Sequence, residues 1–328
     1  MYDLHDYARM IADPRRMGPY VRALEAVVRP GSVIVDVGAG TGIFSLVACR
    51  LGARRVYAIE TNEAVEVARE LARENGCADR IVFFQADARD VELPERADVV
   101  VSDLRGALPL YADHLAVIAD ARARWLKPGG VLVPERDSLV VAAVDAPDLY
   151  ARALGPPVGP LGVTLESMRA HLRNATLYER APGQVEPLTL VTESAPWATL
   201  DYASVVPATI RGHVELRVTH PGQAHGLVVW FETVLTPGHG FASVPGEENC
   251  YGRVFLPWPH AVTLSKGDVV AVDLWAQPDG DPWGWNSSIS GGGDVGESFK
   301  QSSFLAHATR PVGRSRPSDA FVERTHLR

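Results

Sequence analysis

The stretch Asp36-Val37-Gly38-Ala39-Gly40-Thr41-Gly42 decides the fold of this 328-residue chain. It ends the β-branched run Ser32–Val37 and precedes the apolar segment Ile43–Leu51, so we expect a strand, a tight loop and a helix. Glycines let the backbone approach a ligand closely, and the N-terminus of the following helix offers free N–H groups. This stretch therefore predicts a nucleotide-like ligand at the end of a strand.

Strands and helices continue to alternate up to Pro134. A helix capped by Asn62 and stopped by Gly76 follows the second strand, and a later helix over Ala112–Leu126 is closed by the turn Lys127–Gly130. Alternation of this kind is typical of βαβ units, so the sequence predicts an α/β Rossmann-like domain with a mostly parallel sheet. Its further strands are expected at Arg55–Ile59, Ile81–Phe84, Ala97–Ser102 and Val131–Val133.

Beyond Pro134 the pattern changes to short β-rich runs separated by proline and glycine turns. We expect a projecting arm over about 149–177 with a helix at Thr164–Leu172, a loop or hairpin tip at Ser287–Gly296 and a frayed tail over 310–328. The domain boundaries predicted from this change are 1–30 for N-terminal lid helices, 31–134 for the α/β domain and 135–328 for a β-rich domain. Its strands are expected at Leu139–Val144, Thr209–Val218, Gly226–Leu235, Tyr251–Leu256 and Val269–Trp275.

Composition narrows the class of protein. The 32 basic and 40 acidic residues give a formal net charge of −8, which disfavours nucleic acid and anionic membranes as partners. Three widely spaced cysteines argue against a disulfide framework, so we expect a cytoplasmic protein. Neither an apolar leader nor a stretch long enough to span a membrane is recognisable. The histidines lack metal-ligand spacing, and we assign no metal-binding residue.

Two acidic residues at strand ends specify the ligand. Glu60 follows the second strand, where a carboxylate accepts both hydroxyls of a ribose. Asp87, with the backbone of Ala88, follows the third strand, where it suits the exocyclic amine of an adenine. A dinucleotide fingerprint requires glycine at position 43, where Ile43 stands, so an NAD dehydrogenase is disfavoured. The combination predicts binding of S-adenosylmethionine, with S-adenosylhomocysteine as the product.

At this point the chain resembles class I methyltransferases and, over nearly its full length, the protein arginine methyltransferase family. The resemblance is carried by Asp36–Glu60, Val91–Pro94, Trp125–Arg136 and the β-rich second half. It implies a β-barrel-like substrate domain and a homodimer closed by the arm. It also implies that Met10 lies near the sulfonium and Arg16 on the methionyl carboxylate. The predicted cofactor contacts are Met10, Arg16, Asp36, Gly38, Ala39, Gly40, Thr41, Gly42, Glu60, Thr61, Asp87, Ala88 and Ser102.

The chain departs from the family at the residues that hold a substrate guanidinium. The family's hairpin carries two glutamates, and the equivalent positions here are Asp103 and Ala112, with Asp113 one residue late. One step along a helix turns a side chain by about 100°, so Asp113 is not an obvious replacement. Arg105 adds a cation to the same hairpin. The family's Thr-His-Trp loop aligns with Asn249-Cys250-Tyr251. Arginine is therefore doubtful as the acceptor.

We expect Asp103 to orient the acceptor and to stabilise charge on it, with Tyr111 and Asp113 as further catalytic candidates. The segment Trp283–Asn286, with 301–304 after it, offers aromatic walls for a different acceptor pocket. The leading hypothesis is a methyltransferase that acts on a nitrogen or oxygen of a small molecule or peptide. The alternatives are an arginine methyltransferase with a rearranged hairpin and a non-catalytic scaffold that binds the cofactor.

Overall fold

The computed structural model describes residues 2–179, 187–246, 250–291 and 296–303. Within them the helices are α1 (Leu4–Ala12), α2 (Pro14–Val27), α3 (Ile43–Arg50), α4 (Ala64–Glu74), α5 (His114–Trp125), α6 (Pro147–Leu154) and α7 (Glu166–Leu172), with 3-10 turns η1 (Ala88–Asp90) and η2 (Pro160–Gly162). The first strands are β1 (Val33–Val37), β2 (Arg55–Glu60), β3 (Ile81–Gln85), β4 (Ala97–Ser102) and β5 (Leu126–Val133). The later strands are β6 (Arg136–Asp145), β7 (Leu177–Glu179), β8 (Thr189–Leu190), β9 (Ala195–Asp201), β10 (Ile210–Arg217), β11 (Gly222–Thr236), β12 (His239–Ala242), β13 (Arg253–Leu264), β14 (Val269–Ala276), β15 (Trp283–Ser290) and β16 (Ser298–Ser302).

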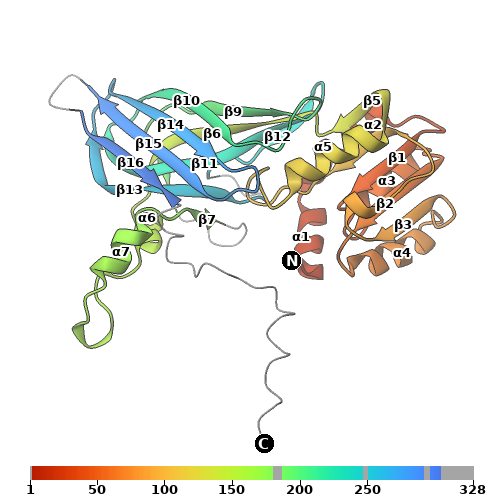
Figure 1. Cartoon of the computed structure of the whole chain (residues 1–328), viewed down its shortest axis with the longest axis horizontal. Helices are drawn as coiled ribbons and strands as arrows, with labels where there is room; N and C mark the ends of the chain where they lie inside the picture. The colour runs from red at the N-terminus through yellow and green to blue at the C-terminus, as the bar shows by residue number, and fades with distance from the viewer. Residues whose placement is uncertain (1, 180–186, 247–249, 292–295, 304–328) are drawn as a thin grey trace, which may run out of the picture.

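Strands β1 to β5 form a parallel sheet in the order β3-β2-β1-β4-β5 (Figure 1). Every residue of β1 is buried, because helices cover both faces of the sheet. Ile34 packs in one cluster with residues of α2 and α3, whereas Val33 and Val35 pack in another with residues of α5. The predicted Rossmann-like fold is confirmed. The order of the strands brings the carboxyl ends of β1 and β4 together at the switch point, because β2 and β3 are added on one side of β1 whereas β4 and β5 are added on the other.

The second half of the chain is antiparallel. One sheet has the order β7-β13-β11-β6-β8, with β12 paired to β11 and β9 to β6, and another has the order β10-β14-β15-β16. Apolar side chains from both sheets, such as Leu227, Leu256 and Trp285, belong to one buried cluster. The β-rich prediction for this half is confirmed.

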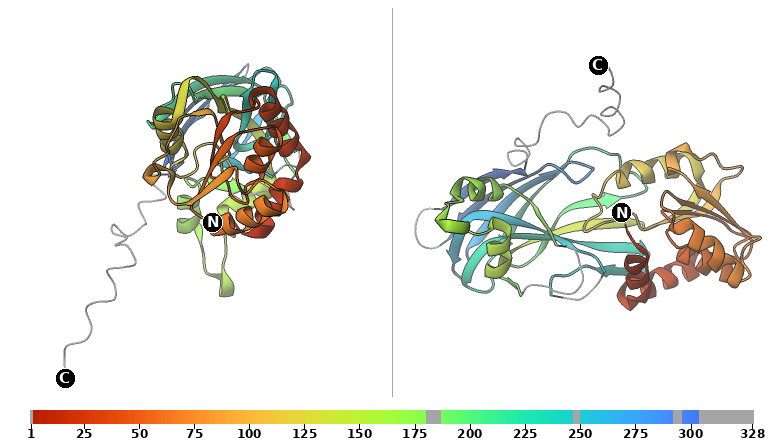
Figure 2. Two further views of the ribbon diagram at one scale, coloured as in Figure 1. Left: turned by 90° about the vertical axis from the view of Figure 1, so that its right-hand side faces the viewer. Right: turned by 90° about the horizontal axis from the view of Figure 1, so that it is seen from below.

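Helices α1 and α2 lie where the parallel sheet and the β-rich half meet (Figures 1 and 2). Tyr20 of α2 stacks on Phe44 of α3, with ring centroids 4.4 Å apart, and lies 6.2 Å from the ring of Phe241 in β12. The N-terminal helices are therefore packed against both halves of the molecule. No helix in the described ranges has the length and apolar character needed to cross a lipid bilayer.

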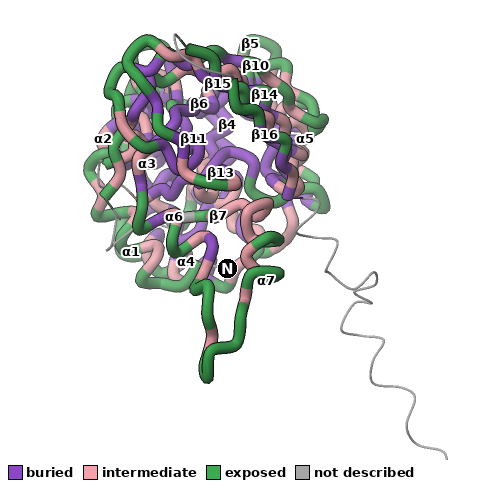
Figure 3. The backbone as a smooth tube through the Cα atoms, turned by 90° about the vertical axis from the view of Figure 1, so that its left-hand side faces the viewer, coloured by how far each residue is buried: buried purple, intermediate pink, exposed green. Residues whose placement is uncertain are grey.

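The segment after β6 projects from the β-rich half as an arm of α6, η2 and α7 (Figure 3). Its helix α7, Glu166–Leu172, matches the helix expected at Thr164–Leu172. The tip exposes apolar side chains: Leu161 is fully exposed and Val163 is 58% exposed. Exposed apolar side chains on a projecting segment are typical of a surface that meets a partner.

One local prediction is wrong. The expected loop at Ser287–Gly296 begins inside strand β15, because residues 287–290 pair with β14 and Ser287 is fully buried. The segment is rich in serine and glycine, and sheet pairing overrides that local preference. The expected turn Lys127–Gly130 falls within the bounds of β5, where the register with β4 jumps from Ala97–Leu126 to Val99–Val131 and Gly129 has a φ of +75°. Residues 292–295 and the predicted tail 310–328 lie outside the described residues.

Candidate cofactor and acceptor site

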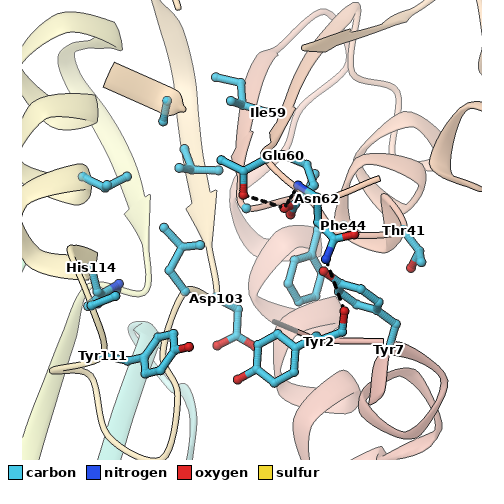
Figure 4. A pocket seen from close by; sticks show the side chains of 18 of the residues that line it. Tyr2, Tyr7, Thr41, Phe44, Ile59, Glu60, Asn62, Asp103, Tyr111 and His114 are labelled. Atoms are coloured by element: carbon cyan, nitrogen blue, oxygen red, sulfur yellow. Dashed lines mark hydrogen bonds between the residues drawn. The ribbon is translucent and has the colours of Figure 1, made fainter. Parts of the chain in front are cut away.

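A cavity with a volume of about 540 Å³ lies at the carboxyl ends of β1, β2 and β4 (Figure 4). Parallel α/β sheets bind ligands at this edge. The cavity brings together most of the predicted residues: Met10, Arg16, Gly38, Ala39, Thr41, Glu60, Thr61, Asp87, Ala88, Asp103, Tyr111 and Asp113. The predicted contacts Asp36, Gly40, Gly42 and Ser102 are not among the lining residues.

The glycine loop forms one wall because its backbone approaches neighbouring side chains very closely. Gly38 has a φ of +73°, and a Cβ built on it would lie 2.2 Å from a methyl carbon of Leu104. Gly40 has a φ of +54°, and a Cβ there would lie 2.4 Å from Cε1 of Tyr7 in α1. A side chain at either position would be both strained and obstructed. The loop therefore requires glycine at position 38 so that Leu104 can lie against it, and at position 40 so that α1 can cover the cavity.

The Glu60 carboxylate is fixed at the end of β2. Its Oε2 accepts the backbone N–H of Gly40 at 2.8 Å, and its Oε1 accepts the backbone N–H of Asn62, also at 2.8 Å. Glu60 is buried and lines the cavity. The hydroxyl of Thr61 also donates to Oε1, at 3.3 Å. Each carboxylate oxygen has two acceptor positions, so the position that remains for a hydroxyl group of a ligand is on Oε2.

Asp36 lies under the loop rather than in the cavity wall. Its Oδ2 accepts both the backbone N–H and the hydroxyl of Ser45, at 3.0 and 2.7 Å. Burial raises the pKa of Asp36 to about 6, although the hydrogen bonds from Ser45 oppose that shift. Asp36 therefore ties β1 to the first turn of α3 and supports the loop from behind.

At the rim, Arg89 binds two of the predicted acids. It donates to both carboxylate oxygens of Asp87, at 3.0 and 2.7 Å, and forms an ion pair with Asp113 at 3.0 Å. The hydrogen bonds from Arg89 lower the pKa of Asp87 to about 2. The Asp113 side chain is 58% exposed. Asp113 therefore faces solvent at the rim, whereas Asp103 lies inside the protein.

Asp103 is already paired with groups of its own chain. Its Oδ2 accepts from Nε of Arg16 at 2.7 Å and from the hydroxyl of Tyr251 at 2.7 Å, and its Oδ1 accepts from Nε of Arg105 at 3.1 Å. Burial by itself would raise the pKa of Asp103, but the two guanidinium groups outweigh burial and keep it below its usual value. The Asp103 carboxylate is thus ionised, and the guanidinium groups of Arg16 and Arg105 balance its charge before any acceptor binds.

Arg105 occupies a closed cage behind Asp103. Its side chain is fully buried, and its Nη1 donates to Oδ1 of Asp137 and to the hydroxyl of Thr233, both at 2.8 Å. Its Nη2 donates to the hydroxyl of Tyr20. Aromatic rings surround the guanidinium, with centroids 5.0 to 5.8 Å away: Phe231, Phe241, Tyr251 and Tyr20. Two carboxylates and several rings therefore enclose a guanidinium that belongs to the chain itself.

The chain is similar to known methyltransferases. Residues 20–134 match the family described as ribosomal protein L11 methyltransferase (PrmA). Over 265 residues the chain is 38% identical to the probable protein arginine N-methyltransferase 6.1 of Oryza sativa subsp. indica, an alignment that covers 79% of this chain and 68% of that protein. Over 290 residues it is 27% identical to protein arginine N-methyltransferase 6 of Xenopus tropicalis, with 84% of each covered. The chain belongs to the protein arginine N-methyltransferase family. It is a methyltransferase of the class that uses S-adenosylmethionine, as the sequence predicted.

The chain spans 58% of another relative, the probable protein arginine N-methyltransferase 6 of Arabidopsis thaliana, with which it shares 28% identity over 74% of its own length. Two solved structures share the fold. Protein arginine methyltransferase 10 of Arabidopsis thaliana has a TM-score of 0.75 and 19% identity, with 92% of this chain and 97% of that chain covered. The Trypanosoma brucei PRMT1 enzyme-prozyme complex with AdoHcy has a TM-score of 0.79 and 20% identity, with 90% and 97% covered.

The predicted aromatic wall is wrong. Trp283 and Trp285 are fully buried, and neither lines the cavity. The indole N–H of Trp285 donates to the side chain of Gln301 at 2.9 Å, and that of Trp283 donates to the carbonyl of Gly280 at 2.7 Å. These tryptophans fill the core of the β-rich half because each polar atom finds a partner there. Residue 304 of the adjoining segment lies outside the described residues.

Several residues that line the cavity were not predicted from the sequence. Tyr7 lies one turn before Met10 on α1, so helical spacing from Met10 is a signal that would have found it. Phe44, the second residue of α3, packs against Tyr20, and its position directly after the glycine loop is a weaker signal. His114 also lines the cavity, next to Tyr111 (Figure 4). Its partners are distant in sequence, and no local pattern identifies them.

The loop that aligns with the family's Thr-His-Trp segment contacts the lid and the hairpin instead. The backbone N–H of Cys250 donates to Oδ2 of Asp13 at 2.7 Å, and Tyr251 donates to Asp103. Asn249 lies outside the described residues. At the two described positions, neutral side chains replace the histidine and tryptophan expected from the family.

Proposed function

We propose that the chain transfers a methyl group from S-adenosylmethionine to a nitrogen or oxygen of an acceptor other than protein arginine. One observation carries this proposal: both oxygens of Asp103 are bound by the chain's own Arg16 and Arg105. The second glutamate of the family hairpin is replaced by Ala112, so a substrate guanidinium would meet no free carboxylate at either position. Burying an unpaired cation is costly, and such an acceptor is therefore disfavoured.

S-adenosylmethionine fits the groups that line the cavity. When bound, it supplies a methyl group activated by a sulfonium. We propose that the Glu60 carboxylate accepts its ribose hydroxyls and that Asp87, with the backbone of Ala88, holds its adenine. Arg16 would bind its carboxylate while its Nε stays on Asp103, and Met10 would pack near the sulfur. The remaining proposed contacts are Gly38, Ala39, Thr41 and Thr61.

The chain's own residues would also prepare the acceptor. Asp103 stays ionised and immobile because it accepts three hydrogen bonds, so we propose that it fixes Arg16 and the hairpin rather than leaving to bind an acceptor. Tyr111 is 49% exposed and lines the cavity, and its hydroxyl is a candidate for orienting the acceptor. Asp113, paired with Arg89 at the rim, is placed for contact with the outer part of the acceptor.

Arginine remains the second candidate acceptor, because the relatives are named as arginine N-methyltransferases. The deciding experiment measures transfer of a labelled methyl group from S-adenosylmethionine to an arginine-rich peptide and to a set of small amines, alcohols and phenols. We expect methylation among the small molecules and none on the peptide. Robust formation of methylarginine would overturn the proposed acceptor class, and binding without turnover on any acceptor would favour a scaffold.

We further propose a homodimer in which the arm docks on the cofactor domain of a second copy. The support is the exposed apolar tip of the arm, where Val158, Leu161 and Val163 face solvent in the single chain. The division into lid, cofactor domain and substrate domain at residues 30 and 134 belongs to the same proposal. A cytoplasmic setting is proposed from the three cysteines, all of which are free thiols.

A further inference from the structure

A second groove lies beside the proposed cofactor cavity. Its volume of about 540 Å³ is enclosed by residues around the start of α5, the loop between β9 and β10, and the turn between β14 and β15. Helix α5 lies where the two halves of the chain meet (Figure 1), a usual place for small-molecule sites. Ala112 and Asp113 line both the groove and the cavity, so the two adjoin there. Further lining residues of the groove are Pro207, Trp275, Pro278, Asp279 and Pro282.

Trp275 gives the groove an aromatic wall. Of the seven tryptophans, all of which the structure describes, the other six are at most 4% exposed, whereas Trp275 is only partly buried. It pairs across the sheet with Gly284, where a Cβ would clash with the indole nitrogen. The guanidinium of Arg211 lies 5.9 Å from the ring centroid, and Arg211 does not line the groove. The ring is therefore held in place and remains available to stack on an apolar ring of a ligand.

The turn between β14 and β15 is fixed before a ligand binds. The backbone N–H of Gly280 donates to the carbonyl of Gln277 at 2.9 Å. The carbonyl of Gly280 accepts from the hydroxyl of Tyr178 at 2.6 Å and from the indole N–H of Trp283 at 2.7 Å. Gly280 also lies so close to the carbonyl of Leu110 that a side chain there would be obstructed. The groove is therefore preformed, and a ligand does not have to order this wall.

The groove is acidic. No lysine or arginine is among its lining residues, all of which belong to the described part of the chain. Asp279 is exposed and forms no ion pair with a described residue. Asp113 shares the guanidinium of Arg89 with Asp87. Three carboxylates along the groove and the adjoining rim thus have one guanidinium between them, and a cationic group complements that charge.

We propose that the groove binds the part of the acceptor that is not methylated, and that this part is an apolar ring bearing a protonated amine. This inference rests on the proposed function and adds the shape and charge of the acceptor to it. The reacting nitrogen or oxygen lies in the cofactor cavity, and the acceptor extends past Ala112 and Asp113. Its ring contacts Trp275, and its amine faces Asp279. The methyl side chain of Ala112 leaves room for that path, where the family's hairpin carries a glutamate.

Fluorescence of Trp275 reports on the groove without turnover. Acrylamide quenches exposed indoles, so it should quench a fraction of the wild-type emission that is missing in Trp275→Phe. The protein is loaded with S-adenosylhomocysteine and titrated with 2-phenylethylamine and with 2-phenylethanol, its uncharged counterpart. We expect the amine to protect that fraction at about two- to fivefold lower concentration, the effect of one exposed ion pair. Protection by neither probe would overturn the groove as a binding site, and equal protection by both would overturn the cationic group.

Asp279→Asn removes the proposed partner of the amine. Asp273→Asn is the matched control, because Asp273 is exposed on β14, pairs with His213 and does not line the groove. We expect the difference between amine and alcohol to vanish in Asp279→Asn and to persist in Asp273→Asn. A difference that survives in Asp279→Asn would contradict the assigned partner. The same titrations without S-adenosylhomocysteine keep the two proposals apart: if that ligand fails to bind, the proposed function is contradicted, even where the amine still protects Trp275.

Discussion

At the scale of single residues, Glu60 and Arg105 illustrate two kinds of buried charge. Glu60 is held by backbone N–H groups and keeps acceptor capacity for a ligand, whereas Arg105 is enclosed by its own chain. We expect Glu60→Gln to weaken binding of S-adenosylhomocysteine about 10- to 100-fold, the value of one charge-assisted hydrogen bond. Isothermal titration calorimetry measures this change, with exposed Glu66→Gln on α4 as the control. Equal affinity in both variants would exclude Glu60 from ribose binding.

Arg105→Met tests the cage. Removing the guanidinium leaves the fully buried Asp137 without its counter-ion, whereas Asp103 keeps Arg16, so the free energy of unfolding should fall by about 3–5 kcal/mol. Urea unfolding followed by circular dichroism measures the loss. Arg54→Met is the matched control, because its ion pair with Glu95 is largely exposed and contributes at most about 1 kcal/mol. Similar losses in the two variants would show that the cage is not a closed ionic site.

We expect His114 to contribute to the pH dependence of the free energy of unfolding. Its folded-state pKa of about 3 lies below the unfolded value of about 6.5, so the unfolded chain binds the extra proton between these values. His114 thus contributes stability above pH 6.5 that is lost as the pH falls, by up to about 1.4 kcal/mol per pH unit. Asp36, with its pKa raised to about 6, acts in the opposite direction. Urea unfolding at pH 7 and pH 5 should show a smaller loss in His114→Gln, and an identical slope would refute the depressed pKa.

At the scale of elements, the glycine loop and α1 form one unit. Gly40→Ala would place a Cβ against Tyr7, so we expect α1 to be displaced and affinity for S-adenosylhomocysteine to fall about tenfold or more. Gly31→Ala is the control, since Gly31 also has a positive φ but has no atom within 4 Å of its Cβ position. Hydrogen exchange should show faster exchange of α1 in the first variant alone. Unchanged hydrogen exchange and unchanged affinity in Gly40→Ala would show that the position of α1 does not depend on the glycine loop.

Those elements could be predicted from the sequence whose structure depends on residues close together in the chain. The loop after β1 and the acid at the end of β2 follow from strand periodicity and glycine chemistry, and the structure places Gly38 and Glu60 together in the cavity wall. The cage and the contact of His114 with Tyr202 were not predictable, because Arg105 meets Thr233 and His114 meets Tyr202 only after the two halves of the chain pack. Trp283 and Trp285 misled the prediction because an aromatic pair in a strand has the same sequence pattern in a core as in a pocket.

At the scale of the whole molecule, the arm is the feature that a single chain leaves uncovered (Figure 3). If it docks on a second copy, Leu161→Glu combined with Val163→Glu should convert a dimer into a monomer, because two buried charges would oppose association. Light scattering after size-exclusion chromatography gives the mass. Both residues are exposed in the single chain, so the fold should persist, which circular dichroism checks. A wild-type protein that is monomeric at micromolar concentration would remove the dimer proposal.

The account depends on an adenosyl ligand in the cavity between the glycine loop, Glu60 and α1. Calorimetric titration of the full chain with S-adenosylhomocysteine tests this most directly, with NADH titrated in parallel. We predict one binding site per chain for S-adenosylhomocysteine and no heat of binding for NADH. Saturable binding of NADH with none of S-adenosylhomocysteine would contradict the account.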